Sequence, residues 1–186
     1  PEKVVVPSYL PDVPEVRSDI CDYYLEVQDF DREVGEALEL ITKRGELENT
    51  IIIICGDNGW MMPRGLANLY DFGTRVPLII SWPNKYPGNR VVDDFVSLND
   101  LAPTIIDAAG HSIPGNYTAE TLLPLLESDL QGDTKFARPY MYMARERHAL
   151  CRQDGLGYPG RAIRSKEYLY IHNITPDRWP AGDPPL

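Results

Sequence analysis

A run of four isoleucines at residues 51–54 constrains the fold of this chain more than any other feature. The run is too short to span a membrane, and β-branched apolar residues in such a run are typical of a strand buried on both faces. It is followed closely by Gly56, Asp57, Asn58 and Gly59. Ligands of open α/β sheets bind at the carboxyl ends of the strands. The run therefore predicts an α/β fold with a candidate site at its end.

Asp57 and Asn58 allow two interpretations. Their carboxylate and amide oxygens suit a hard cation such as Ca²⁺. The same pair followed by Gly59 is also typical of an Asx turn, in which the two side chains cap the strand. From these residues alone, both interpretations stay open. Cys55, at the end of the strand, is expected to be a small buried apolar residue.

A long helix is predicted before this strand. Apolar residues recur at steps of three, four or seven between residues 20 and 41, which indicates one amphipathic helix. Asp12 is a candidate cap, Pro14 suits the first turn, and Gly45 suits the position just beyond the last turn. A helix that leads into a buried strand is typical of half of a doubly wound sheet.

The chain after the strand begins with a long loop at residues 56–75 that holds four glycines. A loop of this length in a compact domain is usually functional. The apolar and alternating patterns that follow predict two helices and three further strands. The strands are expected at residues 76–82, 139–143 and 162–171, and the helices near residues 97–109 and 119–127. Tyr168 and Tyr170 are expected to pack within the sheet.

The loop carries the motif on which a family resemblance depends. After Asp57, Asn58 and Gly59 come Gly65, Leu69, Tyr70, Asp71, Gly73, Arg75, Val76 and Pro77, then Trp82 and Pro83. This order resembles the sulfatase family of the alkaline-phosphatase superfamily, and especially its heparan N-sulfatase-like branch. The resemblance continues through residues 10–35 on one side and residues 97–110 on the other, so it covers nearly the whole chain.

The resemblance implies a fold and an activity. Residues 1–130 would be the C-terminal half of the catalytic core, part of a doubly wound mixed sheet flanked by helices. Residues 131–186 would begin a small antiparallel C-terminal subdomain. The family hydrolyses sulfate esters or sulfamates, and the resemblance implies a sulfated carbohydrate as substrate. It also implies that Asp57 and Asn58 hold Ca²⁺ together with two aspartates from an earlier strand. An amide at the second position favours calcium, whereas the zinc phosphatases of the superfamily use histidine there.

Two residues are candidates for binding the substrate. Arg64 lies in the loop, and a guanidinium group binds tetrahedral oxyanions well. His148 lies in an Arg-Glu-Arg-His segment that resembles one near the cleft of the N-sulfatase-like branch. Either residue could instead be an ordinary surface side chain. Leu66 stands where the family has a lysine that contacts the sulfate, and leucine supplies neither charge nor a hydrogen bond. This replacement supports an alternative function, a non-catalytic relative that serves as a binding or structural module.

The sequence contains no Cys-x-Pro-Ser-Arg motif, which sulfatases convert to the formylglycine nucleophile. The first residues do not have the pattern of a signal peptide. We therefore expect an internal segment of a longer sulfatase, with no catalytic residue of its own and no turnover when isolated. The resemblance implies a periplasmic, secreted or lysosomal protein.

Composition argues against other classes of partner. The net charge of the 186 residues is −10, which disfavours nonspecific nucleic-acid binding, because such binding needs cations that displace phosphate counterions. No apolar run approaches the roughly 18 residues that a membrane span requires. The three cysteines are widely spaced and indicate neither a zinc ribbon nor a disulfide framework.

Overall fold

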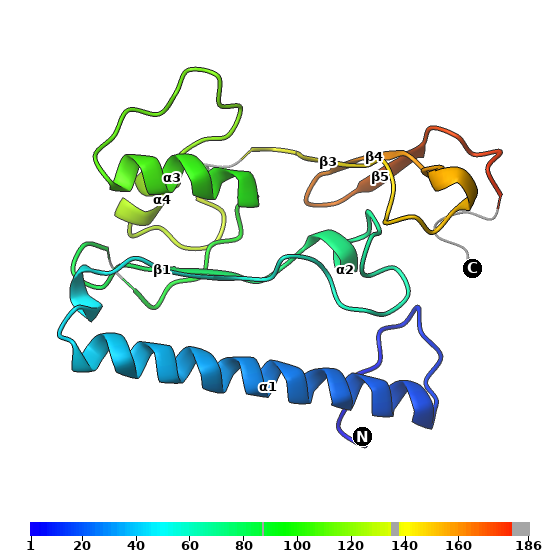
Figure 1. Ribbon diagram of the computed structural model, residues 1–186, viewed down its shortest axis with the longest axis horizontal. Coiled ribbons are helices and arrows are strands. Elements are labelled where there is room, and N and C mark those ends of the chain that lie inside the picture. The colour runs from blue at the N-terminus through cyan, green and yellow to red at the C-terminus, as the bar shows by residue number, and fades with distance from the viewer. Residues whose placement is uncertain (87, 135–137, 180–186) are drawn as a thin grey trace. The chain divides into compact units, whose positions relative to one another are not determined.

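The protein is represented by a computed structural model that describes residues 1–86, 88–134 and 138–179 (Figure 1). The chain divides into two compact units. The first comprises Pro1–Thr50 and Trp82–Asn84, and the second comprises Ile51–Ser81 and Lys85–Leu186.

The first unit is built on one long helix, α1 (Pro14–Lys43), followed by the short 3-10 helix η1 (Leu47–Asn49). Pro14 opens α1 and Gly45 takes a positive φ of 72° after its end, as predicted. The predicted cap is wrong. Val13 occupies the N-cap position, and Asp12 instead accepts two hydrogen bonds from Arg17, at 2.5 and 2.8 Å.

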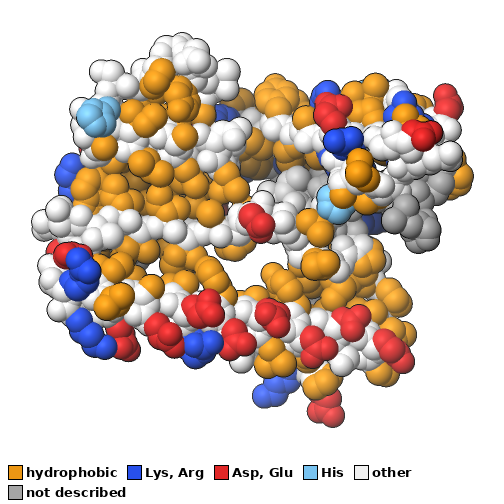
Figure 2. Space-filling view, in the orientation of Figure 1, with side chains coloured by type: hydrophobic (Ala, Val, Ile, Leu, Met, Phe, Trp, Pro, Cys, Tyr) orange, Lys and Arg blue, Asp and Glu red, His pale blue; other side chains and the backbone are white. Residues whose placement is uncertain are grey.

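The surface of α1 is strongly acidic, and Figure 2 shows red carboxylate side chains spread along the helix. Its apolar stripe is only partly covered. Ile20 is fully buried, whereas Tyr23, Tyr24 and Val27 are exposed. The periodicity therefore identified the helix correctly but overstated how much of it is buried within this unit.

The second unit begins with a pair of antiparallel strands, β1 (Ile52–Cys55) and β2 (Leu78–Ser81), in which Cys55 lies opposite Leu78. The short helix α2 (Asp71–Thr74) lies in the loop between them. The isoleucines of β1 are half-buried and Cys55 is exposed, so the expectation of a fully buried strand ending in a buried cysteine is wrong. Within the described residues the ladder pairs β1 with β2 alone, which leaves part of its surface uncovered.

Two helical segments follow near the predicted positions. The 3-10 helix η2 (Leu98–Asp100) leads directly into α3 (Leu101–Ala108), and α4 (Leu123–Glu127) comes later. Arg90 caps the end of α4 by donating to the carbonyl oxygens of Leu125 and Leu126, at 2.9 and 2.7 Å.

Asp100 is the most heavily bonded buried carboxylate of this region, with 1% of its surface exposed. Arg138 donates to its two oxygens at 2.8 and 2.6 Å. The backbone N–H groups of Ser97 and Glu120 donate as well, at 2.8 and 3.1 Å. Burial opposes ionisation of Asp100, but these hydrogen bonds outweigh it and lower the pKa of the carboxyl. Asp100 therefore ties three separate segments of the chain together.

The second unit ends in a three-stranded antiparallel sheet of β3 (Met141–Arg145), β4 (Gly160–Arg164) and β5 (Leu169–Asn173). The 3-10 helix η3 (Gln153–Gly155) lies between β3 and β4. The predicted strand at residues 162–171 is in fact a hairpin. Ser165 makes the turn, because its hydroxyl accepts hydrogen bonds from the N–H groups of Glu167 and Tyr168, at 3.2 and 3.0 Å. The α/β class and the antiparallel C-terminal sheet are both confirmed.

The tyrosines of the last hairpin do not pack as expected. Tyr168 is 77% exposed and Tyr170 is 63% exposed, so the predicted packing role is wrong for both. Tyr170 lies beside Ile163 and Tyr142 in the ladder, on the face opposite to buried Ala162. Among the described residues, no helix has the length and apolar character needed to cross a membrane.

Candidate functional site

Asp57 and Asn58 follow the end of β1, and both side chains are exposed. The ladder ends where the N–H of Gly56 donates to the carbonyl oxygen of Pro77, at 3.1 Å. One carboxylate oxygen of Asp57 accepts from the N–H of Asn58, at 2.9 Å, and the amide nitrogen of Asn58 donates to the carbonyl oxygen of Gly59, at 2.8 Å. These local bonds agree with a turn.

The same bonds also fit a cation ligand. They engage one oxygen of Asp57 and the nitrogen of Asn58, so the second carboxylate oxygen and the amide oxygen keep their capacity to bind a hard cation. Within the described residues, no group of three or more His, Cys, Asp and Glu side chains is arranged to hold a metal ion. The donor chemistry of the pair suits calcium, and it supplies part of the six to eight oxygens that calcium takes.

The loop after this pair is held tightly by its own backbone. A Cβ atom at Gly59 would overlap the carbonyl oxygen of Phe72, and one at Gly73 would overlap the carbonyl oxygens of Gly65 and Asn68. The N–H of Gly59 donates to the carbonyl oxygen of Gly73, at 3.2 Å. Glycine is therefore required where the two ends of the loop meet, and the loop behaves as a packed unit.

Arg64 lies exposed in this loop with its guanidinium 5.2 Å from the ring centroid of Tyr70. Its φ is 62°, in the left-handed region that glycine adopts most easily. Ala67 also has a positive φ, of 61°. An arginine in this conformation costs roughly 1 kcal/mol relative to glycine. The backbone conformation at position 64 would therefore favour glycine over arginine.

Leu66 is half-buried between these two residues. Its N–H donates to the carbonyl oxygen of Trp60, at 2.8 Å, and its own carbonyl accepts from the amide of Asn68, at 3.1 Å. The backbone at Leu66 is therefore fixed by the loop, while its side chain offers no charge.

His148 lies exposed after β3, with its Nδ1 3.9 Å from the sulfur of Cys151. Arg64 contacts Tyr70, and His148 contacts Cys151. The structure thus brings Asp57 and Asn58 together, as their adjacency requires, and places Arg64 in the same loop. The assignment of all four residues to one site stays a prediction.

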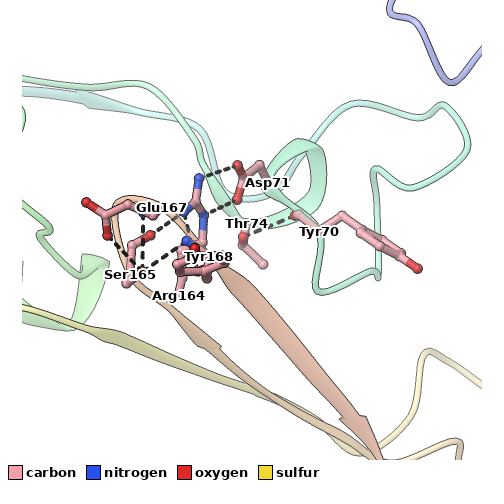
Figure 3. A network of polar contacts seen from close by, with 7 residues as sticks. All are labelled: Tyr70, Asp71, Thr74, Arg164, Ser165, Glu167 and Tyr168. Atoms are coloured by element: carbon pink, nitrogen blue, oxygen red, sulfur yellow. Dashed lines mark hydrogen bonds and ion pairs between the residues drawn. The ribbon is translucent and has the colours of Figure 1, made fainter.

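Sequence reasoning missed two arginines that bind the loop from the C-terminal sheet. Arg145, the last residue of β3, donates to the carbonyl oxygen of Ala67. Arg164, the last residue of β4, binds both carboxylate oxygens of Asp71 at 2.9 Å (Figure 3). The sequence signals were Asp71 within the loop motif and the Arg-Glu-Arg-His segment that Arg145 opens, and neither revealed these contacts, which join residues 93 and 78 positions apart.

Comparisons with known proteins identify a matching family and several relatives. The family model described as Sulfatase matches residues 7–111, more than half of the chain. Human N-sulphoglucosamine sulphohydrolase is 31% identical over 94% of the chain and 35% of its own length. An N-acetylglucosamine-6-O-sulfatase of Bacteroides thetaiotaomicron is 31% identical over 87% of the chain and 29% of its own length.

A solved structure has a similar fold. The structure of BT4656 in complex with its substrate D-glucosamine-2-N,6-O-disulfate matches with a TM-score of 0.71 and 25% identity. The match covers 81% of this chain and 30% of that protein. The chain therefore spans about a third of the length of these relatives.

Proposed function

The chain belongs to the sulfatase family, and we propose from this that it is part of an enzyme that hydrolyses sulfate esters or sulfamates on carbohydrate. In this proposal residues 1–130 form the later half of the catalytic core, and residues 131–186 begin the small C-terminal subdomain. The nucleophile lies elsewhere in the protein. The 186-residue chain by itself then has no sulfatase turnover.

The observation that carries the proposal is the exposed Asp57–Asn58 pair at the end of β1. We assign these residues as two ligands of a calcium ion, with the remaining ligands supplied from other parts of the protein. A calcium ion bound there would polarise a sulfate oxygen and stabilise the charge that develops as the S–O or S–N bond breaks. Asp57 and Asn58 would hold the ion with their side-chain oxygens.

We assign Arg64 and His148 to substrate binding. The guanidinium of Arg64 can bind two oxygens of a sulfate group, which partly replaces the charge lost at Leu66. The left-handed backbone of Arg64 supports this role, because strained residues concentrate at functional sites. His148 is exposed and can donate a hydrogen bond to a sugar hydroxyl or sulfate.

The names of the relatives suggest the substrate class. One is named for N-sulphoglucosamine, one for N-acetylglucosamine 6-O-sulfate, and the BT4656 structure holds a glucosamine 2-N,6-O-disulfate. A relative from Formosa agariphila, 30% identical over 95% of the chain, is named an ulvan-active sulfatase. We therefore propose a sulfated sugar, and sulfated glucosamine is the first substrate to test.

The test measures sulfate released from glucosamine 2-N-sulfate and 6-O-sulfate by the complete protein that contains this chain. We expect turnover that is lost on chelation, restored by calcium and abolished in Asp57→Asn, whereas the control Asp129→Asn, an exposed aspartate on a different loop, retains it. Arg64→Met should lower kcat/KM about 10²- to 10³-fold. Turnover that survives both chelation and Asp57→Asn would contradict the assignment.

Leu66 specifically supports the alternative of a non-catalytic binding module. Under the enzymatic proposal, Leu66→Lys raises turnover of the wild-type protein and partly rescues Arg64→Met. Under the alternative, the protein binds calcium or a sulfated sugar but releases no sulfate, and Leu66→Lys does not change this. The two proposals are separated by the same assay.

A further inference from the structure

One face of the C-terminal sheet is occupied by the loop that carries the candidate site. In the ladder, Arg145 lies opposite Gly160 and Met141 lies opposite Arg164. Because side chains alternate along a strand, positions 160, 162 and 164 of β4 share a face with Arg145 of β3. Arg145, Gly160 and Arg164 all contact the loop from this face.

The loop follows β4 along its length. Leu69 lies over Gly160, since a Cβ atom there would come within 3.1 Å of its side chain. At the same end of the sheet, Arg145 donates to the carbonyl oxygen of Ala67. At the other end, Arg164 binds Asp71. The segment from Ala67 to Asp71 is thus fastened at both ends, by one arginine each.

The Arg164–Asp71 contact has the geometry of a specific ion pair. Both bonds measure 2.9 Å, and the side chains are 23% and 43% exposed. Figure 3 shows the guanidinium facing the carboxylate, with Arg164 also donating to the carbonyl oxygen of Ser165 on its own hairpin. The hydrogen bond to Asp71 raises the pKa of Arg164. The paired donors and acceptors fix the orientation of Asp71 as well as its distance.

From Asp71 the connection to the candidate metal ligands is short. Asp71 is the first residue of α2, and the next residue, Phe72, packs its carbonyl oxygen against Gly59. The rings of Phe72 and Trp60 are stacked, with centroids 5.2 Å apart. Gly59 directly follows Asn58. A movement of α2 would therefore move the backbone that presents Asp57 and Asn58.

We propose that Arg164 and Arg145 are positioning residues, which hold the loop at residues 56–75 and thereby fix the backbone that presents Asp57 and Asn58. They act through their contacts with Asp71 and Ala67. The value of this positioning for catalysis rests on the proposed function. The holding of the loop does not, and it can be measured in the chain by itself.

The first experiment measures amide hydrogen exchange in the purified chain. Arg164→Met should speed exchange within residues 56–75 by roughly fivefold, while the β4–β5 ladder keeps its protection. Arg161→Met is the matched control, because Arg161 lies on the opposite face of the same strand and pairs with Glu146. Exchange in the loop that is equal in the two variants would overturn the proposal. So would a rise of the same size across β3, β4 and β5.

A second set of variants separates positioning from general loss of structure. Arg164→Lys keeps the charge but not the paired geometry, and should give an intermediate rate. Adding Asp71→Leu to Arg164→Met should produce little further increase, because the two variants remove the same contact. Fully additive effects of the two substitutions would show that the pair does not act as one unit, and would overturn the role of Arg164.

A third measurement, on the complete protein, distinguishes this proposal from the proposed function. If Asp57 and Asn58 bind calcium, Arg164→Met should weaken calcium affinity about tenfold, with partial rescue by Arg164→Lys. A looser loop with unchanged calcium affinity would overturn the positioning role. If the wild-type protein binds no calcium, the proposed function fails instead, and the exchange experiment alone decides whether these arginines hold the loop.

Discussion

Two arginine–aspartate pairs in the second unit have nearly the same geometry but very different surroundings. Arg138 and Arg164 each bind both oxygens of one carboxylate. Asp100, the partner of Arg138, is 1% exposed and also accepts two backbone hydrogen bonds, whereas Asp71 is 43% exposed. A buried carboxylate that loses its partners cannot be solvated, but a half-exposed one can. We infer that the first pair stabilises the unit as a whole and the second mainly fixes a loop.

The largest effect is expected from Asp100→Asn. The change removes the charge that Arg138, Ser97 and Glu120 all donate to, and should lower the free energy of unfolding by about 2–4 kcal/mol. Urea denaturation measures it, with Asp129→Asn as an exposed control. A loss of stability no greater than that of the control would show that the buried Arg138–Asp100 pair does not stabilise the unit as a whole.

Acid should reveal the same difference. The folded pKa of Asp100 lies below its usual value, so its stabilisation is complete above about pH 4, the ordinary pKa of aspartate, and is lost as the pH falls through the folded pKa. The wild-type chain should therefore lose stability more steeply below about pH 4 than Asp100→Asn. Parallel pH profiles of the two proteins would show that Asp100 does not carry this dependence.

A smaller effect on stability is expected from Asp71→Asn. Because both partners are partly exposed, the free energy of unfolding should fall by only about 0.5–1 kcal/mol. The same denaturation experiment measures it. If the loss matched that of Asp100→Asn, the second pair would also stabilise the whole unit, and burial would not distinguish the two pairs.

The smallest effect is expected from Glu146→Gln. Glu146 pairs with Arg161 at 2.5 Å, but the side chains are 68% and 47% exposed. Exposed ion pairs contribute little, so the change should stay within about 0.5 kcal/mol. A larger loss would show that the contribution of these ion pairs to stability follows their distance and not their burial.

Local patterns allowed much of the fold to be predicted. The periodicity of α1, Pro14 at its start and Gly45 past its end identified that helix, and the leucine-rich segment identified α4. Burial was predicted less well, since it depends on what packs against an element. Cys55 and Tyr170 have strand patterns typical of packed residues, yet both are exposed. The turn at Ser165 was missed even though the polar residues 164–167 interrupt the alternation of apolar residues there.

The candidate site shows the same limit more sharply. Asp57 and Asn58 could be identified from neighbouring residues alone. The apolar run just before them predicts the end of a strand, and their own side chains supply the oxygens. Arg164 and Arg145 could not, because their partners Asp71 and Ala67 lie 93 and 78 residues away. Nothing in the local pattern of a strand-ending arginine reveals such a contact. Polar pairs between residues so far apart in the sequence can be identified only once the fold is known.

The left-handed backbone at Arg64 and Ala67 has a consequence for how the loop can vary. Side chains with a branched β-carbon are poorly accommodated in that conformation, whereas glycine, asparagine and aspartate enter it easily. In a saturation library screened for a folded loop, position 67 should accept those three residues and reject valine and isoleucine. Glycine, asparagine and aspartate at position 64 should also allow the loop to fold, but the protein should lose activity. That difference between folding and activity would show that the function requires the side chain of Arg64.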